Sequence, residues 1–189
     1  MQTVSFTTMA EGTKADYELL DRAGEAHMAT MPARLMAALE ALKDSYSGYQ
    51  VTRYEHSLQS ATRAHAAGKD EEYVVMALLH DLGDELAPLT HGELMGAILR
   101  PYVRPELVWI AKHHGVFQTF YYAHHYGDDP NARDRFRDSP WFDACVEFCA
   151  QYDQNCFDPA FESQPAEFFA PMVGRVFASP RYLTGAELV

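Results

Sequence analysis

Apolar positions recur with helical spacing along most of the chain. In "PARLMAALEALKDS", residues 32–45, they return every three or four residues among strong helix formers. "TRYEHSLQSATRAHAAG", residues 52–68, carries a second stripe that stops at a glycine. "DEEYVVMALLHD", residues 70–81, begins with acidic residues, which the helix dipole favours in a first turn. We predict a helix over each of these three segments.

Two further segments carry start signals for helices. In "THGELMGAILR", residues 90–100, Thr90 and Glu93 have the spacing of a capping box. "RPELVWIAKHHG", residues 104–115, places Pro105 where a first helical residue is expected and closes with a glycine. We therefore predict two more helices, the second of which ends at that glycine.

The rest of the chain fits the same fold class. "SPWFDACVEFCAQYD", residues 139–153, pairs a capping serine with a proline and predicts another helix. Near the C-terminus, "PAEFFAPMVGRVF", residues 165–177, has apolar residues at roughly helical spacing. We expect it to pack on the core, and a dimer surface is the alternative. Only the aromatic stretch "VFQTFYYAHHYG", residues 116–127, competes as a strand. The fold class predicted is all-α.

Composition limits the possible functions. A chain of 189 residues with 48% hydrophobic residues is long enough for one domain with a sizeable core, so we expect a single domain over residues 1–189 in which residues 1–15 are mobile. The net charge of -12 disfavours nonspecific binding to nucleic acid and to anionic membranes. The chain has no apolar run of about 20 residues and no basic region followed by an apolar one at its start, so a cytoplasmic protein is expected.

Three cysteines lie within a dozen residues, at positions 145, 149 and 156. Their odd number in a chain that is expected to be cytoplasmic predicts reduced thiols rather than a disulfide framework. We interpret them as small core residues.

Polar residues end two of the predicted helices in places that should face the core. His80 and Asp81 follow directly on a long apolar run. Asp153 extends the row of Phe142 and Cys149 at helical spacing, so its carboxylate would point inward. Burying an ionised carboxylate without a partner is prohibitive, which means that Asp153 needs a cation, a strong hydrogen-bond network or a frayed helix end.

Further histidines stand on or near the same helices. His56 is available to the interior of its helix, His91 falls in a first helical turn, and His113 and His114 close a helix whose phase permits either to face inward. Taken alone, His91 would be a surface residue. The ordered set of His56, His80-Asp81, His91, His113 or His114, and Asp153 favours metal ligation instead.

This order of residues, together with "ALLHDLGD", resembles the HD-domain superfamily of helical metalloproteins over about residues 46–158. The resemblance implies a helical bundle with a binuclear metal site in its core and with His80 and Asp81 at the catalytic centre. Imidazole and carboxylate donors suit divalent iron, manganese or zinc, and a bridging Asp81 can hold two metals near one substrate. The implied ligands are His56, His80, Asp81, His91, His113 or His114, and Asp153.

Two reactions are known in families of this kind. Most HD-domain proteins resemble phosphohydrolases, whereas a smaller branch uses two irons and dioxygen and includes inositol oxygenase and oxygenases that cleave the carbon-phosphorus bond of hydroxylated aminoethylphosphonates. The six-position ligand set, the short chain and "YSGYQVTRYEHSLQSA", residues 46–61, resemble the phosphonate branch. The resemblance implies a mixed-valent Fe(II)/Fe(III) pair, dioxygen as cosubstrate and an organophosphonate substrate in a monomer or homodimer. A phosphohydrolase acting on a phosphomonoester or nucleotide is the alternative, and a noncatalytic metal-binding or sensing module is the third interpretation.

The resemblance also implies substrate contacts. Tyr46 corresponds to a tyrosine that reaches one iron in the resting phosphonate enzyme, although it is equally consistent with a packing residue. Asp84 stands where related oxygenases carry a basic group, so it either faces a cationic end of the substrate, as in the oxygenase for (R)-1-hydroxy-2-(trimethylamino)ethylphosphonate, or caps the loop before Pro88. Lys112 and Arg53 are candidates for holding an anion, and Gln118 completes the predicted substrate-binding set.

Aromatic residues near these positions offer rings for cation-π contacts with a quaternary ammonium. The alternative is that these rings belong to the core. The rings in question are Tyr49, Tyr54, Phe117, Phe120, Tyr121 and Tyr122.

Overall fold

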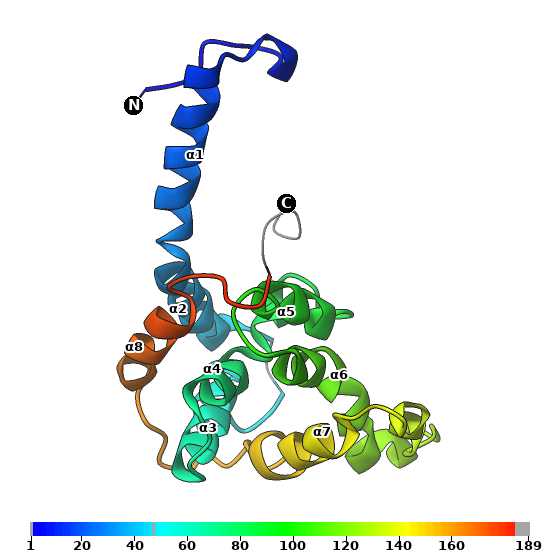
Figure 1. Ribbon diagram of the computed structural model, residues 1–189. Helices are drawn as coiled ribbons and strands as arrows, with labels where there is room; N and C mark the ends of the chain where they lie inside the picture. Colours follow the sequence, from blue (N-terminus) through cyan, green and yellow to red (C-terminus); the bar gives the residue numbers. More distant parts are fainter. Residues whose placement is uncertain (1, 47, 184–189) are drawn as a thin grey trace.

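The computed structural model describes residues 2–46 and 48–183, and within these ranges all regular structure is helical (Figure 1). The prediction of an all-α fold is confirmed. The α-helices are α1 (Lys14–Met28), α2 (Met31–Ala41), α3 (Arg53–Ala66), α4 (Glu71–Leu79), α5 (His91–Leu99), α6 (Pro105–Tyr122), α7 (Phe142–Phe148) and α8 (Ala166–Val176). Short 3₁₀ turns lie at Met9–Glu11, Leu42–Asp44, Leu82–Glu85, Ala123–His125 and Ala132–Phe136.

Helix α4 forms the centre of the fold. Every residue from Tyr73 to Leu79 is buried, because α4 packs against α3, α6 and α8. A helix that is apolar on all sides has no solvent face, which explains why its sequence lacks an amphipathic stripe. Because α4 is buried, the two residues that follow it, His80 and Asp81, also lie in the interior of the molecule.

Helix α3 begins with a capping box that the sequence analysis did not use. The Thr52 hydroxyl accepts a hydrogen bond from the Glu55 N–H, and the Glu55 carboxylate accepts one from the Thr52 N–H. Two such bonds satisfy donors that a helix N-terminus otherwise leaves unpaired. The start of α3 is therefore fixed one turn ahead of His56.

Helix α5 begins at His91 as predicted, but the predicted capping box is wrong. Thr90 makes no side-chain capping bond, and Glu93 instead pairs with Lys112 of α6 at 3.0 Å. Close packing between α5 and α6 fixes this junction. A Cβ atom at Gly92 would lie 2.6 Å from the Lys112 carbonyl oxygen, so only glycine permits the two helices to approach this closely.

Helix α6 continues beyond its predicted end at Gly115 and runs through the aromatic stretch to Tyr122. A glycine within a helix costs only about 1 kcal/mol relative to alanine. The buried Phe117, two residues further on, contributes packing that exceeds this cost. His124 and His125 follow in a 3₁₀ turn and are exposed.

Helix α7 ends in a turn of unusual geometry. It begins at Phe142, later than the predicted serine, and its last turn, Cys149–Asp153, is a π-helix. The Gln154 N–H donates to the Cys149 carbonyl at 3.0 Å, which is the i to i-5 bond of such a turn. Single π turns occur frequently at functional sites. The three cysteines are buried free thiols, as predicted.

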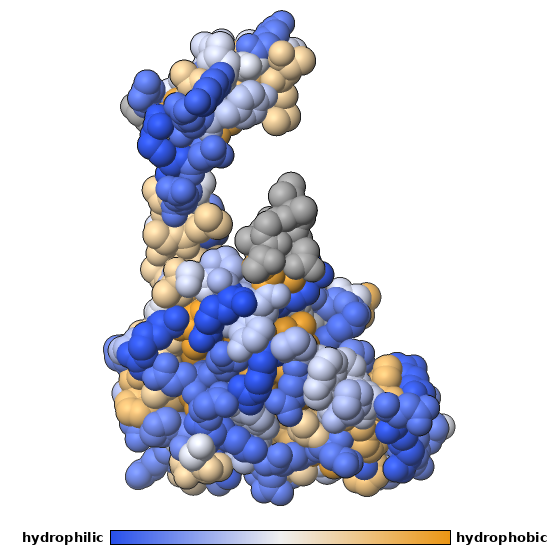
Figure 2. All heavy atoms as spheres, viewed as in Figure 1, coloured by the Kyte–Doolittle hydropathy of each residue, from blue (hydrophilic) through white to orange (hydrophobic). Residues whose placement is uncertain are grey.

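Helix α1 stands apart from the other helices (Figure 1) and was not predicted. Its sequence signal is the capping box of Thr13 and Asp16, which the structure contains. The N-terminal segment lies along it, since Ser5 donates to the Asp16 carboxylate and Phe6 stacks on Tyr17. Hydrophilic residues cover most of the face of the molecule that Figure 2 shows, which is the same view as in Figure 1.

Helix α8 packs against α4 and α2, which confirms that the C-terminal apolar stretch covers the core. Its buried residues are Ala166, Phe169, Val173 and Val176. Among the described residues, none of the helices combines the length and the apolar character needed to cross a membrane.

Candidate metal centre

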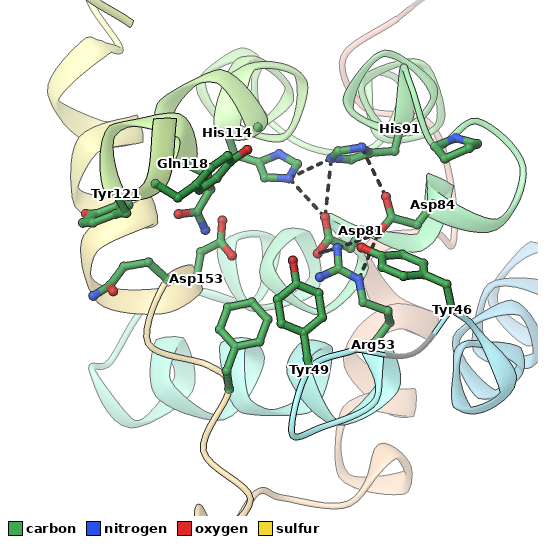
Figure 3. A pocket seen from close by; sticks show the side chains of 15 residues that line it. Tyr46, Tyr49, Arg53, Asp81, Asp84, His91, His114, Gln118, Tyr121 and Asp153 are labelled. Atoms are coloured by element: carbon green, nitrogen blue, oxygen red, sulfur yellow. Dashed lines mark hydrogen bonds and ion pairs between the residues drawn. The ribbon is translucent and has the colours of Figure 1, made fainter. Parts of the chain in front are cut away.

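Six polar side chains meet in the interior, next to the end of α4. Figure 3 shows Asp81, His91, His114 and Asp153 among them. Their nitrogen and oxygen atoms form three overlapping groups, and within each group the atoms lie within 4.8 Å of one another. Five of the six residues are at most 3% exposed, whereas the His91 side chain is 22% exposed. The six are His56 of α3, His80 and Asp81 after α4, His91 of α5, His114 of α6 and Asp153 of the π turn.

The two carboxylate oxygens of Asp81 face two different pairs of histidines. Oδ2 lies 3.2 Å from His56 Nε2 and 3.3 Å from His80 Nε2. Oδ1 lies 3.1 Å from His114 Nε2 and 3.6 Å from His91 Nε2. This is the arrangement of a carboxylate that can bridge two cations.

Asp153 belongs to the side of His56 and His80. Its Oδ1 atom lies 3.3 Å from His56 Nε2 and 3.6 Å from His80 Nε2. We call His56, His80 and Asp153 the inner half of the centre. His91 and His114 form the outer half, and Asp81 lies between the two.

Three of the four histidines are oriented by backbone carbonyl groups. A carbonyl oxygen only accepts hydrogen bonds, so each of these rings carries a proton on Nδ1 and turns its Nε2 atom toward the cluster. The pairs are His56 Nδ1 with the Cys156 carbonyl at 3.1 Å, His80 Nδ1 with that of Ala77 at 2.7 Å, and His114 Nδ1 with that of Ala111 at 2.7 Å.

The donor atoms fit bound metal ions. The Nε2 atoms of His56 and His80 are 3.2 Å apart, and those of His91 and His114 are 3.1 Å apart. Two ligand nitrogens that share a cation at about 2.1 Å would be separated by about 3.0–3.4 Å, whereas two facing lone pairs repel each other. The buried Oδ2 atom of Asp153 also has no hydrogen-bond partner among the described residues. A cation would satisfy all of these groups.

The carboxylates of the cluster also favour protonation of the buried histidines. Burial lowers the pKa of His56, but hydrogen bonds to Asp153 and Asp81 outweigh it and raise that pKa to about 9. Burial opposes protonation of His114 as well, and Asp81 raises its pKa to about 9. Burial raises the pKa of Asp81, but the charges of His80 and Arg53 outweigh burial and hold that pKa well below its usual value. Metal binding to this cluster would therefore displace protons.

Arg53 and Asp84 form a buried ion pair beside the cluster. Asp84 Oδ2 accepts hydrogen bonds from Nε of Arg53, at 2.9 Å, and from its Nη2, while Asp84 Oδ1 lies 3.2 Å from His91 Nδ1. Arg53 Nη2 also donates to Asp81 Oδ2 at 2.6 Å. Both oxygens of Asp84 are therefore engaged within the site, and it does not cap the loop before Pro88.

A pocket of about 310 Å³ opens beside the cluster. Both outer-half histidines line it, together with Arg53, Asp84 and Gln118. Aromatic rings form much of its wall, namely Tyr46, Tyr49, Tyr121, Tyr122 and Phe157.

The aromatic wall is continuous with the metal centre. Tyr49 stacks on Phe157 with ring centroids 4.7 Å apart, and Phe157 stacks on His56 at 4.6 Å. Tyr46 is 57% exposed and lines the pocket next to Tyr49.

Two residues of the predicted site lie elsewhere. His113 bonds through Nδ1 to the Trp109 carbonyl at 2.8 Å and stacks on the Trp109 ring, so the structure places His114 in the cluster and His113 outside it. Lys112 does not line the pocket, because its ammonium pairs with Glu93 in a solvent-exposed contact. The structure therefore brings His114, of the two histidines that the sequence left open, into the cluster, and it leaves Lys112 outside the pocket.

Three of the predicted aromatic contacts also lie outside the pocket. Phe117 is buried in the core, Tyr54 lies beneath the Lys43 ammonium, and Phe120 lies beneath the Arg133 guanidinium. The pocket instead contains Phe157 and Gln154, which the sequence analysis did not select. Both follow the π turn in a segment without regular periodicity, so no helical pattern could have identified them.

Comparison with known proteins identifies one domain within the chain. Residues 53–138 match the family model of the HD domain, and this range contains every residue of the cluster except Asp153. No curated protein matches the sequence. The helical fold and the His-Asp cluster agree with the family match and with metal binding. The chain therefore contains an HD domain over residues 53–138, which supports the resemblance to the HD-domain metalloprotein superfamily.

Proposed function

We propose that the protein is a di-iron, dioxygen-dependent oxygenase that cleaves the carbon-phosphorus bond of a 1-hydroxy-2-(trimethyl)aminoethylphosphonate-type substrate. The observation that carries the proposal is the position of Asp81 between two histidine pairs, beside a small aromatic pocket. The HD-domain superfamily comprises metal-dependent hydrolases and oxygenases. The resemblance of residues 46–61 to the phosphonate-cleaving branch supports the oxygenase.

The donor set divides between two irons. The inner half and Asp81 would hold one ion, while Asp81 and the outer half would hold the other. When bound, the two irons supply Lewis acidity and the electrons that activate dioxygen. Nitrogen and oxygen donors without thiolates suit such an open binuclear centre better than a closed structural zinc site.

The proposed reaction balances without an external reductant. The carbon-phosphorus bond breaks, the hydroxyl-bearing carbon becomes a carboxylate, and phosphorus leaves as phosphate. One dioxygen molecule accepts the four electrons, and the products contain two more oxygen atoms than the substrate. The carbon-bound hydrogen and the hydroxyl hydrogen account for the proton on phosphate and the proton released.

The pocket supports a small zwitterionic substrate. Its volume of about 310 Å³ lies at the low end for small-molecule sites and is better suited to an aminoethylphosphonate than to a nucleotide. The tyrosine rings that line it would attract a quaternary ammonium bound against their faces. Gln118 would donate a hydrogen bond to a phosphonate oxygen, and Tyr46 would contact the substrate.

A phosphohydrolase is the alternative, and one feature favours it. Arg53 places a guanidinium beside Asp81, where a cation would help to bind a phosphate group. The same metals would then polarise a phosphomonoester and activate water. Because Arg53 is already paired with Asp81 and Asp84, this feature is weaker support than the size of the pocket.

The experiment that tests the proposal measures dioxygen uptake and phosphate release by iron-loaded protein that was purified anaerobically. The substrates are (R)-1-hydroxy-2-(trimethylamino)ethylphosphonate, 1-hydroxy-2-aminoethylphosphonate and p-nitrophenyl phosphate. We expect one phosphate per dioxygen from a hydroxyphosphonate and none under anaerobic conditions. Phosphate release from the phosphomonoester without dioxygen would instead establish the hydrolase.

A further inference from the structure

We infer that Asp84 is a positioning residue that orients His91, and through it the outer metal, and is not a contact for the cationic end of the substrate. The inference rests on the binuclear centre of the proposed function. It holds for an oxygenase and for a hydrolase, because it concerns the assembly of the site.

His91 differs from the other three histidines in how its ring is held. His80 and His114 each donate through Nδ1 to the carbonyl group three residues earlier, at Ala77 and Ala111. His91 is the first residue of α5, so no helical turn precedes it to offer such a carbonyl. Within residues 2–46 and 48–183, the polar partner found near its Nδ1 is Asp84 Oδ1 at 3.2 Å.

Asp84 is itself held firmly enough to orient a ring. It lies in the 3₁₀ turn Leu82–Glu85, is 8% exposed, and its N–H donates to the Asp81 carbonyl at 3.0 Å. Close contact joins this turn to the start of α5, since a Cβ atom at Gly83 would lie 2.8 Å from the His91 carbonyl oxygen. Arg53 fixes the remaining carboxylate oxygen of Asp84.

Arg53 extends the network to the bridging carboxylate. Its Nη2 atom donates to Asp81 Oδ2 at 2.6 Å and also to Asp84 Oδ2. Asp84 therefore shares with Asp81 the task of balancing the positive charge of Arg53 beside the metal ions. A substrate ammonium would have to compete for Asp84 with this buried guanidinium, which argues against a direct substrate contact.

The test is a metal titration of metal-free protein with Mn(II), in which electron paramagnetic resonance counts the free ions. We expect two ions per wild-type chain. Asp84→Asn should weaken the outer site by about 10- to 100-fold, the usual effect of removing a partner that orients a ligand. The inner site should change by much less. Glu85→Gln alters the exposed neighbouring residue and is the matched control, with both sites as in wild type.

Asp84→Glu keeps the charge, moves it by one methylene and provides a second variant in case the first does not fold. It should weaken the outer site in the same direction but by less. Unchanged outer-site affinity in both variants would overturn the inference, as would equal weakening of both sites. A single ion in the wild type would overturn the binuclear centre as well. Two wild-type ions with an outer site indifferent to Asp84 would overturn this inference alone.

Discussion

Around His56 and His80 the metal centre is closed off by core packing, whereas around His91 and His114 it opens onto the aromatic pocket. Backbone carbonyls orient both histidines of the inner half, and neither of them lines the pocket. In the outer half, a side-chain carboxylate orients His91, which is partly exposed. The fold therefore fixes the inner half, while the outer half depends on a side-chain network that borders the substrate site.

The change with the largest expected effect removes the residue that both halves share. Asp81→Ala takes away the carboxylate between the two histidine pairs and leaves Arg53 with Asp84 as its remaining carboxylate partner. We expect loss of both metal ions and a loss of activity of at least about 1,000-fold, since the residue acts with every other ligand as a unit. Metal analysis and oxygen uptake measure the two effects. Retention of one tightly bound ion would show that Asp81 does not serve both halves.

The next change separates the halves. His91→Ala should remove the outer ion alone, because the inner half keeps three donors, while stability falls little at a partly exposed position. His56→Ala should weaken the inner ion and also destabilise the protein by about 2–4 kcal/mol, since it empties a fully buried position. Metal stoichiometry and urea unfolding distinguish the two variants. Equal loss of stability in both would contradict the proposed difference between the halves.

A smaller effect is expected in the pocket wall. Tyr49→Leu removes one ring next to the centre but leaves the metal ligands in place. The loss of a cation-π contact of about 1–2 kcal/mol predicts a rise of about 5- to 30-fold in KM for a trimethylammonium substrate. The primary amine substrate and the metal content should change less. An equal effect on both substrates would argue against recognition of the quaternary ammonium.

The smallest effect is expected just outside the outer half. His113→Ala should leave both metal ions bound and cost about 0.5–1.5 kcal/mol of stability through the lost stacking on Trp109. His114→Ala is the paired variant and should disrupt the outer site. Metal titration of the two variants compares the neighbouring positions directly. Loss of an ion in His113→Ala would contradict the placement of its side chain outside the cluster.

Local patterns in the sequence identified much of the fold and several site residues. The apolar run of α4 predicted a buried helix that ends at His80 and Asp81, because nothing in that run offers a solvent face. The inward position of Asp153 was also predicted from helical spacing, although the π turn that produces it was not. A π turn has no composition of its own, so only the tertiary structure reveals it.

The sequence left open whether His113 or His114 faces the core, because the predicted helix ended before its apolar row was complete. The buried row of α6 includes Leu107, Ile110, His114 and Phe117, which is a regular helical face. Ending the predicted helix at Gly115 removed Phe117 from that row and left the phase ambiguous. The Arg53-Asp84 pair is a different case, because it joins residues 31 positions apart on separate elements and has no local signal.

We expect the inner and outer halves of the binuclear centre to bind their ions differently. The most direct test is an anaerobic titration of metal-free wild-type protein with Fe(II), followed by Mössbauer spectroscopy of the iron-57 form. We predict two ions per chain, bound in two steps and giving two distinct iron environments. Binding of a single ion, or of two ions in one step with identical environments, would contradict the difference between the inner and outer halves.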